Sequence, residues 1–479
     1  MWNPRALLVS AAAAVLSYQL LLPPVVALAD NGDFPKIIGR FGLYPRVHRV
    51  YEFASTTYDF HPDRIWNSRF YSSEIPLARL AVFLNSFVSK DGSFDLRLIG
   101  IVHSTLFLAA LWLFAPLLDR AGPLARFWVF AAVLFVFCDA MYASGLNSFY
   151  MDEPAYLFLL LSVVLYLRLL RRPSPLDAAA LIACALLLAA SKEQHAPLGF
   201  CIGALLLVNR RVLFPRRRAA FVSAAACIPL VSLFMLWKGA PSGYAANSVY
   251  DVVFSQLLPH SQNVPRTLAA LRLDDSYLPL VGKNAYWADS RMDNPAFQRE
   301  FRRRVSFATL AVFYATHPRD TWEALRDSLD QAGRESDFGN FDPAAGYPPR
   351  TESRAFRAWS RWKRRLFYHH GERLLAAFLA CSALFALLLH VRRASLPAGA
   401  VSGGLTLIAM ALLELAIASL GDAMDVARHH TIFFALFDIL VLASLTLALV
   451  RPRNRTAAPD SPPGFACASP HPAPTMAAD

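Results

Sequence analysis

The sequence predicts an all-α polytopic membrane protein with about 10 transmembrane helices, a long first outer loop and a small, mostly helical outer domain. Of its 479 residues, 56% are hydrophobic and only 17% are charged, whereas a soluble protein carries about 25% charged residues. The apolar residues also come in blocks of roughly 20, the length of helix that crosses about 30 Å of hydrocarbon. We therefore expect the chain to cross the lipid bilayer many times.

Ten apolar blocks define the predicted spans. They cover residues 6–29, 97–118, 126–144, 154–170, 175–191, 195–209, 219–238, 371–391, 398–420 and 430–450. The first block ends in Ala27-Leu28-Ala29, which resembles a signal-peptidase site. However, the apolar run is longer than the roughly 7–15 residues of a signal-peptide core. We therefore expect the first block to be retained as a span.

The arginines set the predicted topology. With the N-terminus inside, the inner loops carry Arg120, Arg126, Arg168, Arg171, Arg172, Arg210, Arg211, Arg216, Arg217, Arg218, Arg392, Arg393, Arg451, Arg453 and Arg455. The short outer loops carry only Lys192 and Arg428. This asymmetry follows the positive-inside rule and predicts a multi-pass protein of the bacterial inner membrane with both termini in the cytoplasm. It also accounts for the net charge of +12 without a nucleic-acid partner.

This topology divides the chain into four parts. We expect residues 1–238 to form an N-terminal module of about seven spans that includes the outer loop 30–96. Residues 239–370 form an extracytoplasmic loop domain, with helices expected at 295–317 and 321–332. Residues 371–450 form a C-terminal module of three spans. Residues 451–479 are rich in Pro and Ala and are expected to be a disordered cytoplasmic tail.

Acidic side chains gather at the predicted outer ends of the spans. Asp30 and Asp33 directly follow the first span, and Asp152 and Glu153 fill a short outer loop. Ionisable groups beside hydrocarbon are costly, so their default interpretation is functional. The structural alternatives are an acidic turn at 30–33 and, at 152–153, acids that suit the positive end of a helix dipole. Asp139 lies deeper, where we expect no helix cap to explain it.

Basic and amide side chains lie at the same predicted face. Lys192, Gln194 and His195 sit in a hairpin between two spans, which must face water or a cavity. Asp425, Arg428 and His429 stand at i, i+3 and i+4, so one helical face can carry all three. Arginine is suited to bidentate phosphate contacts. The alternatives are a solvated turn at 192–195 and an interfacial salt-bridge cluster at 425–429.

A metal site is one further hypothesis for these acids. Asp30, Asp152 and Glu153 are candidate ligands of a divalent cation, Mg²⁺ or Mn²⁺, because carboxylates are the ligands that such ions prefer. Nothing in the sequence resembles a P-loop or a dinucleotide-binding glycine motif. No other cofactor is therefore expected.

The arrangement resembles the GT-C superfamily of membrane glycosyltransferases, which use polyprenyl-phosphate-linked sugars. Those enzymes keep an acidic motif just after the first span and often a second in the next outer loop, matched here by Asp30 with Asp33 and by Asp152 with Glu153. A narrower resemblance is to bacterial glycan biosynthesis hexose transferases of the S-layer glycan type. It rests on DNGDF (30–34), SKEQHAPLGF (191–200), NSVYDVVFSQLLPHSQN (247–263) and GDAMDVARHHTIFFALFD (421–438).

The resemblance implies inverting transfer of a hexose from a polyprenyl-phosphate-linked donor to a glycan or glycolipid acceptor of the cell envelope. Asp33, or Asp30, would be the general base, with a pKa raised by the low-dielectric boundary. The implied phosphate ligands are Lys192, Arg428 and His429, and Asp152 and Glu153 would bind a sugar hydroxyl or a metal. The implied substrate-binding set also includes Gln194, His195 and Asp425. Tyr58 and Trp66 of the first loop would stack on sugar rings.

Two other classes of function remain open. A transporter or flippase of lipid-linked glycans favours charges near the bilayer midplane and broken helices in paired repeats. A non-catalytic membrane scaffold would bind a partner through residues 239–370. If the protein is a scaffold, substitutions in the acidic motifs should leave its function unchanged. If it is a transferase, they should not.

Overall fold

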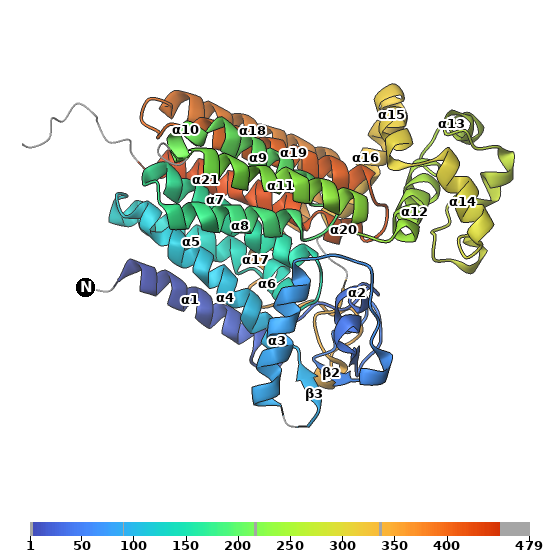
Figure 1. Ribbon diagram of the computed structural model, residues 1–479, viewed down its shortest axis with the longest axis horizontal. Helices are drawn as coiled ribbons and strands as arrows, with labels where there is room; N and C mark the ends of the chain where they lie inside the picture. The colour runs from blue at the N-terminus through green and yellow to red at the C-terminus, as the bar shows by residue number, and fades with distance from the viewer. Residues whose placement is uncertain (1–2, 90, 215–217, 335–337, 451–479) are drawn as a thin grey trace, which may run out of the picture.

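The computed structural model describes residues 3–89, 91–214, 218–334 and 338–450. The expected disordered tail, 451–479, lies outside these residues. Long helices lie side by side in one bundle (Figure 1). They are α1 (Pro4–Leu20), α4 (Arg97–Phe114), α5 (Pro123–Phe137), α7 (Asp152–Arg171), α8 (Pro175–Ala189), α9 (Pro197–Val208), α11 (Arg218–Lys238), α18 (Gly371–Arg392), α19 (Ala400–Leu420) and α21 (Thr431–Leu449). Each of these helices corresponds to one predicted span.

The chain is a polytopic membrane protein. Within the described residues, six helices are long and apolar enough to cross a membrane: those at 97–118, 152–171, 219–238, 371–392, 400–420 and 431–449. A seventh span results if α5 and the short α6 (Ala140–Leu146), bent by 61°, are one broken span. Helices α8 and α9 are apolar but shorter. The count of about ten spans therefore stays a prediction.

The first predicted span ends earlier than expected. Helix α1 stops at Leu20, and Pro23 and Pro24 follow it. Proline lacks the N–H that a continuing helix needs, which explains the early end. The next residues are extended, and the N–H groups of Ala27 and Ala29 donate to the carbonyls of Asn340 and Gly339. The expected helix over 6–29 is therefore wrong beyond Leu20.

Helix α7 is the centre of the bundle. It packs against α4, α8 and α21, and 83% of an apolar 18-residue stretch of this helix is buried inside the protein. Its sequence is apolar on all sides over most of its length, which is typical of a helix surrounded by other helices. The bundle also contains η3 (Ala115–Leu118) and α10 (Arg210–Leu213) between longer helices. Asp152, the first residue of α7, is therefore buried at one end of the bundle.

The loop after α1 is only partly helical. It contains α2 (Pro35–Ile38), η1 (Gly39–Phe41), β1 (Leu43–Pro45), β2 (Thr57–Phe60), η2 (Pro62–Arg64), α3 (Glu74–Val88) and β3 (Ser93–Asp95). The strands form an antiparallel sheet in the order β1-β2-β3. The expectation of an all-α protein is therefore wrong here, because the alternating aromatic residues of β2 suit a strand that buries one face. The protein is mostly helical.

Residues 242–332 build a small helical domain with its own core, at the right of Figure 1. Its elements are α12 (Ser242–Asp251), the π-helix η4 (Val252–Leu257), α13 (Val264–Ala270), η5 (Asp275–Leu280), η6 (Ala288–Ser290), α14 (Pro295–Arg304), α15 (Phe307–Thr316) and α16 (Pro318–Ala332). Phe254, Tyr277 and Phe301 pack in its core. The helix expected over 295–317 is two helices, because Ser306 caps the second one. η7 (Pro343–Ala345) and α17 (Ala358–Phe367) lead back to the bundle.

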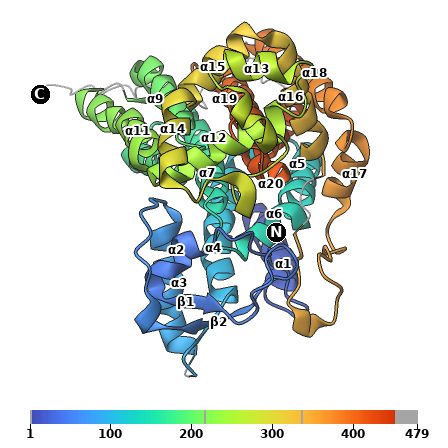
Figure 2. The ribbon, with the colours of Figure 1, turned by 90° about the vertical axis from the view of Figure 1, so that its right-hand side faces the viewer.

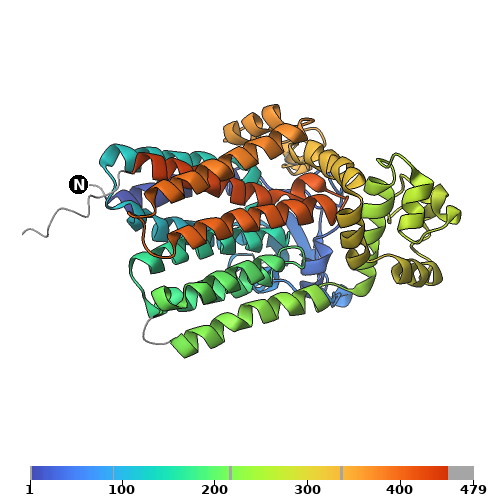
Figure 3. The same ribbon diagram turned by 90° about the horizontal axis from the view of Figure 1, so that it is seen from above.

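The loops gather at one end of the bundle, here called the loop-rich end: segments 30–89, 91–96, 147–151, 190–196, 239–334, 338–370 and 421–430 (Figures 1 and 3). Figure 2, which looks onto this end, shows the short α20 (Val426–His429) between the first loop and the helical domain. Helix α1 begins and α21 ends at the opposite end (Figure 3). That arrangement agrees with termini on one side of the membrane, and the cytoplasmic assignment stays a prediction.

Candidate functional site

Arg428 joins acids from three separate segments at the loop-rich end. Its Nη1 lies 2.7 Å from Asp152 Oδ2, and its Nη2 lies 3.1 Å from Asp33 Oδ2. Asp425 Oδ2 is 3.7 Å away, and the guanidinium lies 4.6 Å from the ring centroid of Tyr150. The Arg428 side chain is only 6% exposed. The sequence placed Asp33, Asp152, Asp425 and Arg428 on one face, and the structure brings them into contact.

The 192–195 hairpin completes this network. Lys192 Nζ lies 3.1 Å from Asp152 Oδ1, and His195 Nε2 lies 3.0 Å from the same oxygen. The other ring nitrogen of His195 lies 2.9 Å from Glu414 Oε1 in α19. Lys192 and His195 are buried, so the interpretation of this hairpin as a solvated turn is wrong. Asp152 likewise does more than suit a helix dipole, because three cationic side chains surround it.

His429 and Gln194 close the other side of the network. His429 Nδ1 lies 2.6 Å from Gln194 Oε1 and 3.3 Å from Lys192 Nζ. Gln194 Nε2 also donates to the His429 carbonyl at 3.0 Å. Asp425 precedes α20 in a left-handed backbone conformation (φ +48°), which Asp tolerates better than most residues. That turn points Arg428 and His429 back toward the hairpin.

The two histidines of the network carry different charges at neutral pH. Burial lowers the pKa of His195, but Glu414 and Asp152 more than offset it and raise the pKa to about 9. Burial, Lys192 and Arg428 together lower the pKa of His429 well below its usual value. His195 is therefore protonated and His429 neutral. A neutral His429 can offer a phosphate a hydrogen bond but no charge. The phosphate-binding role that the resemblance implied for His429 is therefore limited to a hydrogen bond.

Asp33 and Asp30 have different surroundings despite their short spacing. Burial raises the pKa of Asp33, but the cations Lys36 and Arg428 outweigh it, so the net shift is downward. Burial raises the pKa of Asp30, only partly offset by the N–H groups of Phe34 and Gly32 that its Oδ1 accepts at 3.0 and 2.8 Å. The raised pKa that we expected is thus confirmed for Asp30 and wrong for Asp33.

Lys36 is a site residue that the sequence reasoning missed. Its Nζ pairs with Asp33 Oδ1 and lies 4.0 Å from the ring centroid of Tyr244, at the edge of the helical domain. The signal was the i, i+3 spacing of Asp33 and Lys36, which a helical turn brings together. Asp33 remains 17% exposed, so its carboxylate lies at the boundary between the buried network and solvent.

Glu153 packs against Gly145 of α6. Its Oε1 lies 2.0 Å from the position that a Cβ on Gly145 would take. Nearby, His103 Nε2 and Glu74 Oε2 form a buried pair 3.1 Å apart. Asp152 therefore contacts the cations of the network, whereas a carboxylate oxygen of Glu153 lies against α6.

The proposed metal ligands do not fit a cation. Among the described residues, no group of three or more His, Cys, Asp or Glu side chains could hold a metal ion. Both oxygens of Asp152 already accept from Lys192, His195 or Arg428. A divalent ion beside these cations would be repelled.

Two other expectations from the sequence are wrong. Asp139 does cap a helix: its Oδ1 accepts from Met141 N–H at the start of α6, and its Oδ2 accepts from Trp359 N–H and Ser360 N–H. This cap was not predicted because residues 126–144 were expected to form one continuous span, whereas a bend separates α5 from α6. Tyr58 is fully buried against Phe94 and cannot stack on a sugar, whereas Trp66 is exposed.

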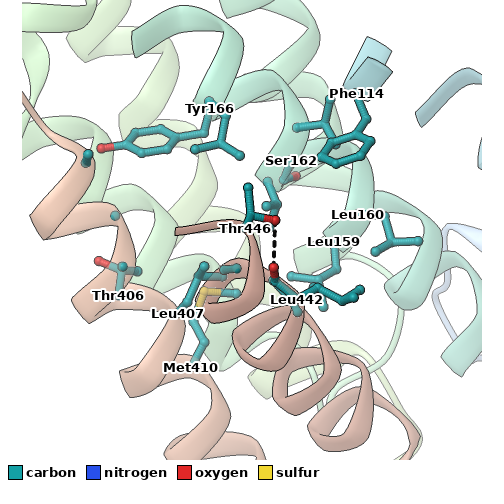
Figure 4. A pocket seen from close by; sticks show the side chains of 18 of the residues that line it. Phe114, Leu159, Leu160, Ser162, Tyr166, Thr406, Leu407, Met410, Leu442 and Thr446 are labelled. Atoms are coloured by element: carbon teal, nitrogen blue, oxygen red, sulfur yellow. Dashed lines mark hydrogen bonds between the residues drawn. The ribbon is translucent and has the colours of Figure 1, made fainter. Parts of the chain in front are cut away.

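An apolar cavity of about 280 Å³ lies deeper in the bundle (Figure 4). Leu159, Tyr166, Met410 and Leu442 are among the side chains that converge on it. Leu159 is about 10 Å along α7 from Asp152, at 1.5 Å per residue. The cavity therefore lies toward the opposite end of the bundle from the polar network.

A comparison with known families gives one match. The family model described as the YfdI N-terminal transmembrane domain matches residues 2–460, nearly the whole chain. No curated protein and no solved structure matches the sequence or the fold significantly.

Proposed function

The chain belongs to the YfdI N-terminal transmembrane domain family, and we propose that it is an integral-membrane glycosyltransferase. In this proposal it transfers a hexose from a polyprenyl-phosphate-linked donor to a glycan or glycolipid acceptor of the cell envelope, at the loop-rich end and with inversion. The GT-C-like arrangement of its acidic motifs supports the proposal. A functional role for the network is also favoured because buried charges are expensive to maintain.

The observation that carries the proposal is the contact of Arg428 with Asp33 and Asp152. Arg428 is buried, and its Nε has no hydrogen-bond partner within the described residues. A guanidinium beside Lys192 and a protonated His195 forms a cationic cluster that suits the phosphate of a lipid-linked sugar. In such a site fixed cations stabilise the charge that develops on a leaving phosphate.

The chemical step uses Asp33 as the base. Its carboxylate takes the proton of the acceptor hydroxyl while the acceptor oxygen bonds to the anomeric carbon. The bond from that carbon to the phosphate oxygen breaks, and its electron pair leaves with the polyprenyl phosphate. The low pKa of Asp33 keeps it ionised but makes it a weak base. A donor phosphate that takes over part of the Arg428 contact raises that pKa as the substrate binds.

The bundle offers a place for the lipid part of the donor. A polyprenyl chain is apolar, and the 280 Å³ cavity is lined almost entirely by apolar side chains. A headgroup at Arg428 would leave its chain to run inward along α7 toward Leu159. Burial of the chain there contributes to affinity in proportion to the apolar area removed from water.

One observation favours the transporter alternative. Helices α5 and α6 form a sharply bent pair, and broken spans are typical of secondary transporters. At this bend, however, the α17 backbone is bound to Asp139, so protein groups satisfy the break. No second bent pair is present in the described part of the chain.

The test uses purified protein in nanodiscs, a radiolabelled polyprenyl-phosphate hexose and a crude glycan acceptor fraction. Wild type is compared with Asp33→Asn and with Asp59→Asn, an exposed aspartate of the first loop, as the matched control. Label transferred by wild type and Asp59→Asn but not by Asp33→Asn supports the proposal. Donor binding without transfer by any of them supports the transporter, and absence of donor binding supports the scaffold.

A further inference from the structure

A small cavity lies beside the Arg428 network and shares two of its residues. Its volume is about 30 Å³, and its lining includes Asp152 and Arg428. Glu153 lines it from the start of α7, and Glu352 and Arg357 line it from the segment before α17. The cavity therefore connects the candidate site with residues 338–357.

Two buried polar atoms of this lining lack partners. Glu352 Oε1 and Arg428 Nε are buried without a hydrogen bond in the described part of the protein. Leaving a buried polar atom unpaired is costly, and more so for a charged group. Glu352 Oε1 is an acceptor and Arg428 Nε is a donor. A hydroxyl group both donates and accepts, so it complements this pair better than an ion of either sign.

Glu352 is held in place by its second oxygen. Its Oε2 lies 2.5 Å from Arg357 Nη1 and 3.0 Å from Arg364 Nη1. Asn340 anchors the same segment, because its Nδ2 donates to the Ala27 carbonyl at 2.8 Å and its Oδ1 accepts from Ser353 N–H at 2.9 Å. These contacts fix the Glu352 carboxylate and leave Oε1 without a partner among the residues that the structure describes.

The size of the cavity limits its occupant. A water molecule needs a cavity of roughly 10–15 Å³, so this cavity accommodates about two non-hydrogen atoms. A sugar ring is too large. The hydroxymethyl arm of a hexose has one carbon and one oxygen, and it is the only part of the ring system that projects as a narrow arm.

We propose that this cavity is the subsite for the primary hydroxymethyl arm of the transferred hexose, with Glu352 Oε1 accepting from its hydroxyl and Arg428 Nε donating to it. The inference rests on the proposed function and deepens it. It makes the protein selective for hexoses with a free primary hydroxyl over 6-deoxyhexoses and pentoses. Glu352 is then a specificity residue contributed by the segment before α17.

The test compares three polyprenyl-phosphate donors that carry a hexose, the matching 6-deoxyhexose and the matching pentose. For wild type we expect kcat/KM to be about 10- to 100-fold higher with the hexose, as for a lost hydrogen bond to a charged group. Glu352→Gln is expected to reduce this preference to a few-fold while transfer of the pentose is retained. Glu300→Gln, at an exposed carboxylate in the helical domain, is the control and is expected to keep the wild-type preference.

A second variant fills the cavity from its other side. Ser144 also lines it, and Ser144→Val adds volume without touching Glu352. We expect it to reduce transfer of the hexose more than transfer of the pentose, and this comparison stands if Glu352→Gln fails to fold. Equal kcat/KM for the three donors with wild type would overturn the subsite and leave water as the occupant.

Failure of the proposed function would be recognised separately. If wild type transfers none of the donors, the subsite is tested by donor binding to the nanodisc protein. Tighter binding of the hexose donor than of the pentose donor, lost in Ser144→Val, supports the subsite without catalysis. Equal binding of the two donors overturns it.

Discussion

Arg428 and Asp33 are 395 residues apart in the chain, yet their Nη2 and Oδ2 atoms lie 3.1 Å apart. This contact ties the first loop to the segment before the last helix and, together with Lys36, lowers the pKa of Asp33. Because Arg428 also bonds Asp152 at 2.7 Å, one guanidinium holds together three parts of the fold. Its substitution therefore tests both stability and function.

Arg428→Lys is expected to lower transfer at least 100-fold. A lysine ammonium cannot span Asp33 and Asp152 with two separate nitrogens, so one buried carboxylate loses its partner. Breaking a buried pair costs about 3–5 kcal/mol when one side is removed, and we expect less for a substitution that keeps the charge. Transfer kinetics and thermal unfolding in the same nanodiscs measure both effects. Arg304→Lys, whose ion pairs are partly exposed, should change neither; equal behaviour of the two variants would contradict a special role for Arg428.

How much of this network could be predicted depends on how local its contacts are. The hydrophobic periodicity located each long helix, and the i, i+3 spacing of Asp425 and Arg428 indicated one face. The convergence of Asp33, Asp152 and Lys192 on one point is set by helix packing, which no local pattern encodes. The pairing of Lys363 with Asp438, 3.1 Å apart, was missed for the same reason. Even the short strand β2 escaped detection, because four residues carry too little periodicity.

The pH dependence of stability should reflect His195. The pKa of this group is raised from 6.5 to about 9 in the folded protein. A raised pKa stabilises the fold fully below about pH 6.5, and this contribution is lost as the pH rises through about 9. We expect the free energy of unfolding to fall over this window by on the order of 3 kcal/mol, at 1.36 kcal/mol per pKa unit. His195→Gln should remove the dependence; an unchanged profile in that variant would assign it to another group.

The Lys363–Asp438 pair should anchor α17 to the bundle. Both side chains are at most 2% exposed, and Trp359 Nε1 also donates to Asp438 Oδ2 at 3.0 Å. Lys363→Met leaves a buried carboxylate without its cation, and we expect a loss of about 3–5 kcal/mol. Limited proteolysis should then cut residues 338–357 faster. The double variant Lys363→Met/Asp438→Leu should recover most of the stability, and a double variant no more stable than the single one would contradict the pair as the anchor.

Gly100 tests the contact between α4 and the loop that leads into α7. A Cβ at Gly100 would lie 1.8 Å from Asn147 Oδ1, and Asn147 Nδ2 donates to the carbonyls of Leu20 and Val26 at 2.9 and 3.0 Å. Gly100→Ala should displace Asn147 and destabilise the protein by about 1–3 kcal/mol, as overpacking does. Thermal unfolding measures the effect. Gly122→Ala, where a Cβ meets nothing within 4 Å, should be close to neutral, and equal effects of the two substitutions would exclude the clash as the cause.

The base assignment is tested most directly through Lys36. This side chain pairs with Asp33 Oδ1. Burial raises the pKa of Asp33, and the charge of Lys36 is the largest influence that lowers it. Lys36→Gln keeps the approximate length but removes the charge, so the pKa of Asp33 should rise. If Asp33 is the base, transfer requires its ionised form, and the acid limb of the kcat/KM profile should move to higher pH. Lys283→Gln, which removes a partly exposed pair with Asp289, should leave the limb in place.

A uniform loss of rate in Lys36→Gln with no movement of the limb would mean that the group titrating in the acid limb is not Asp33. Asp30, whose pKa burial raises, would then become the base to test.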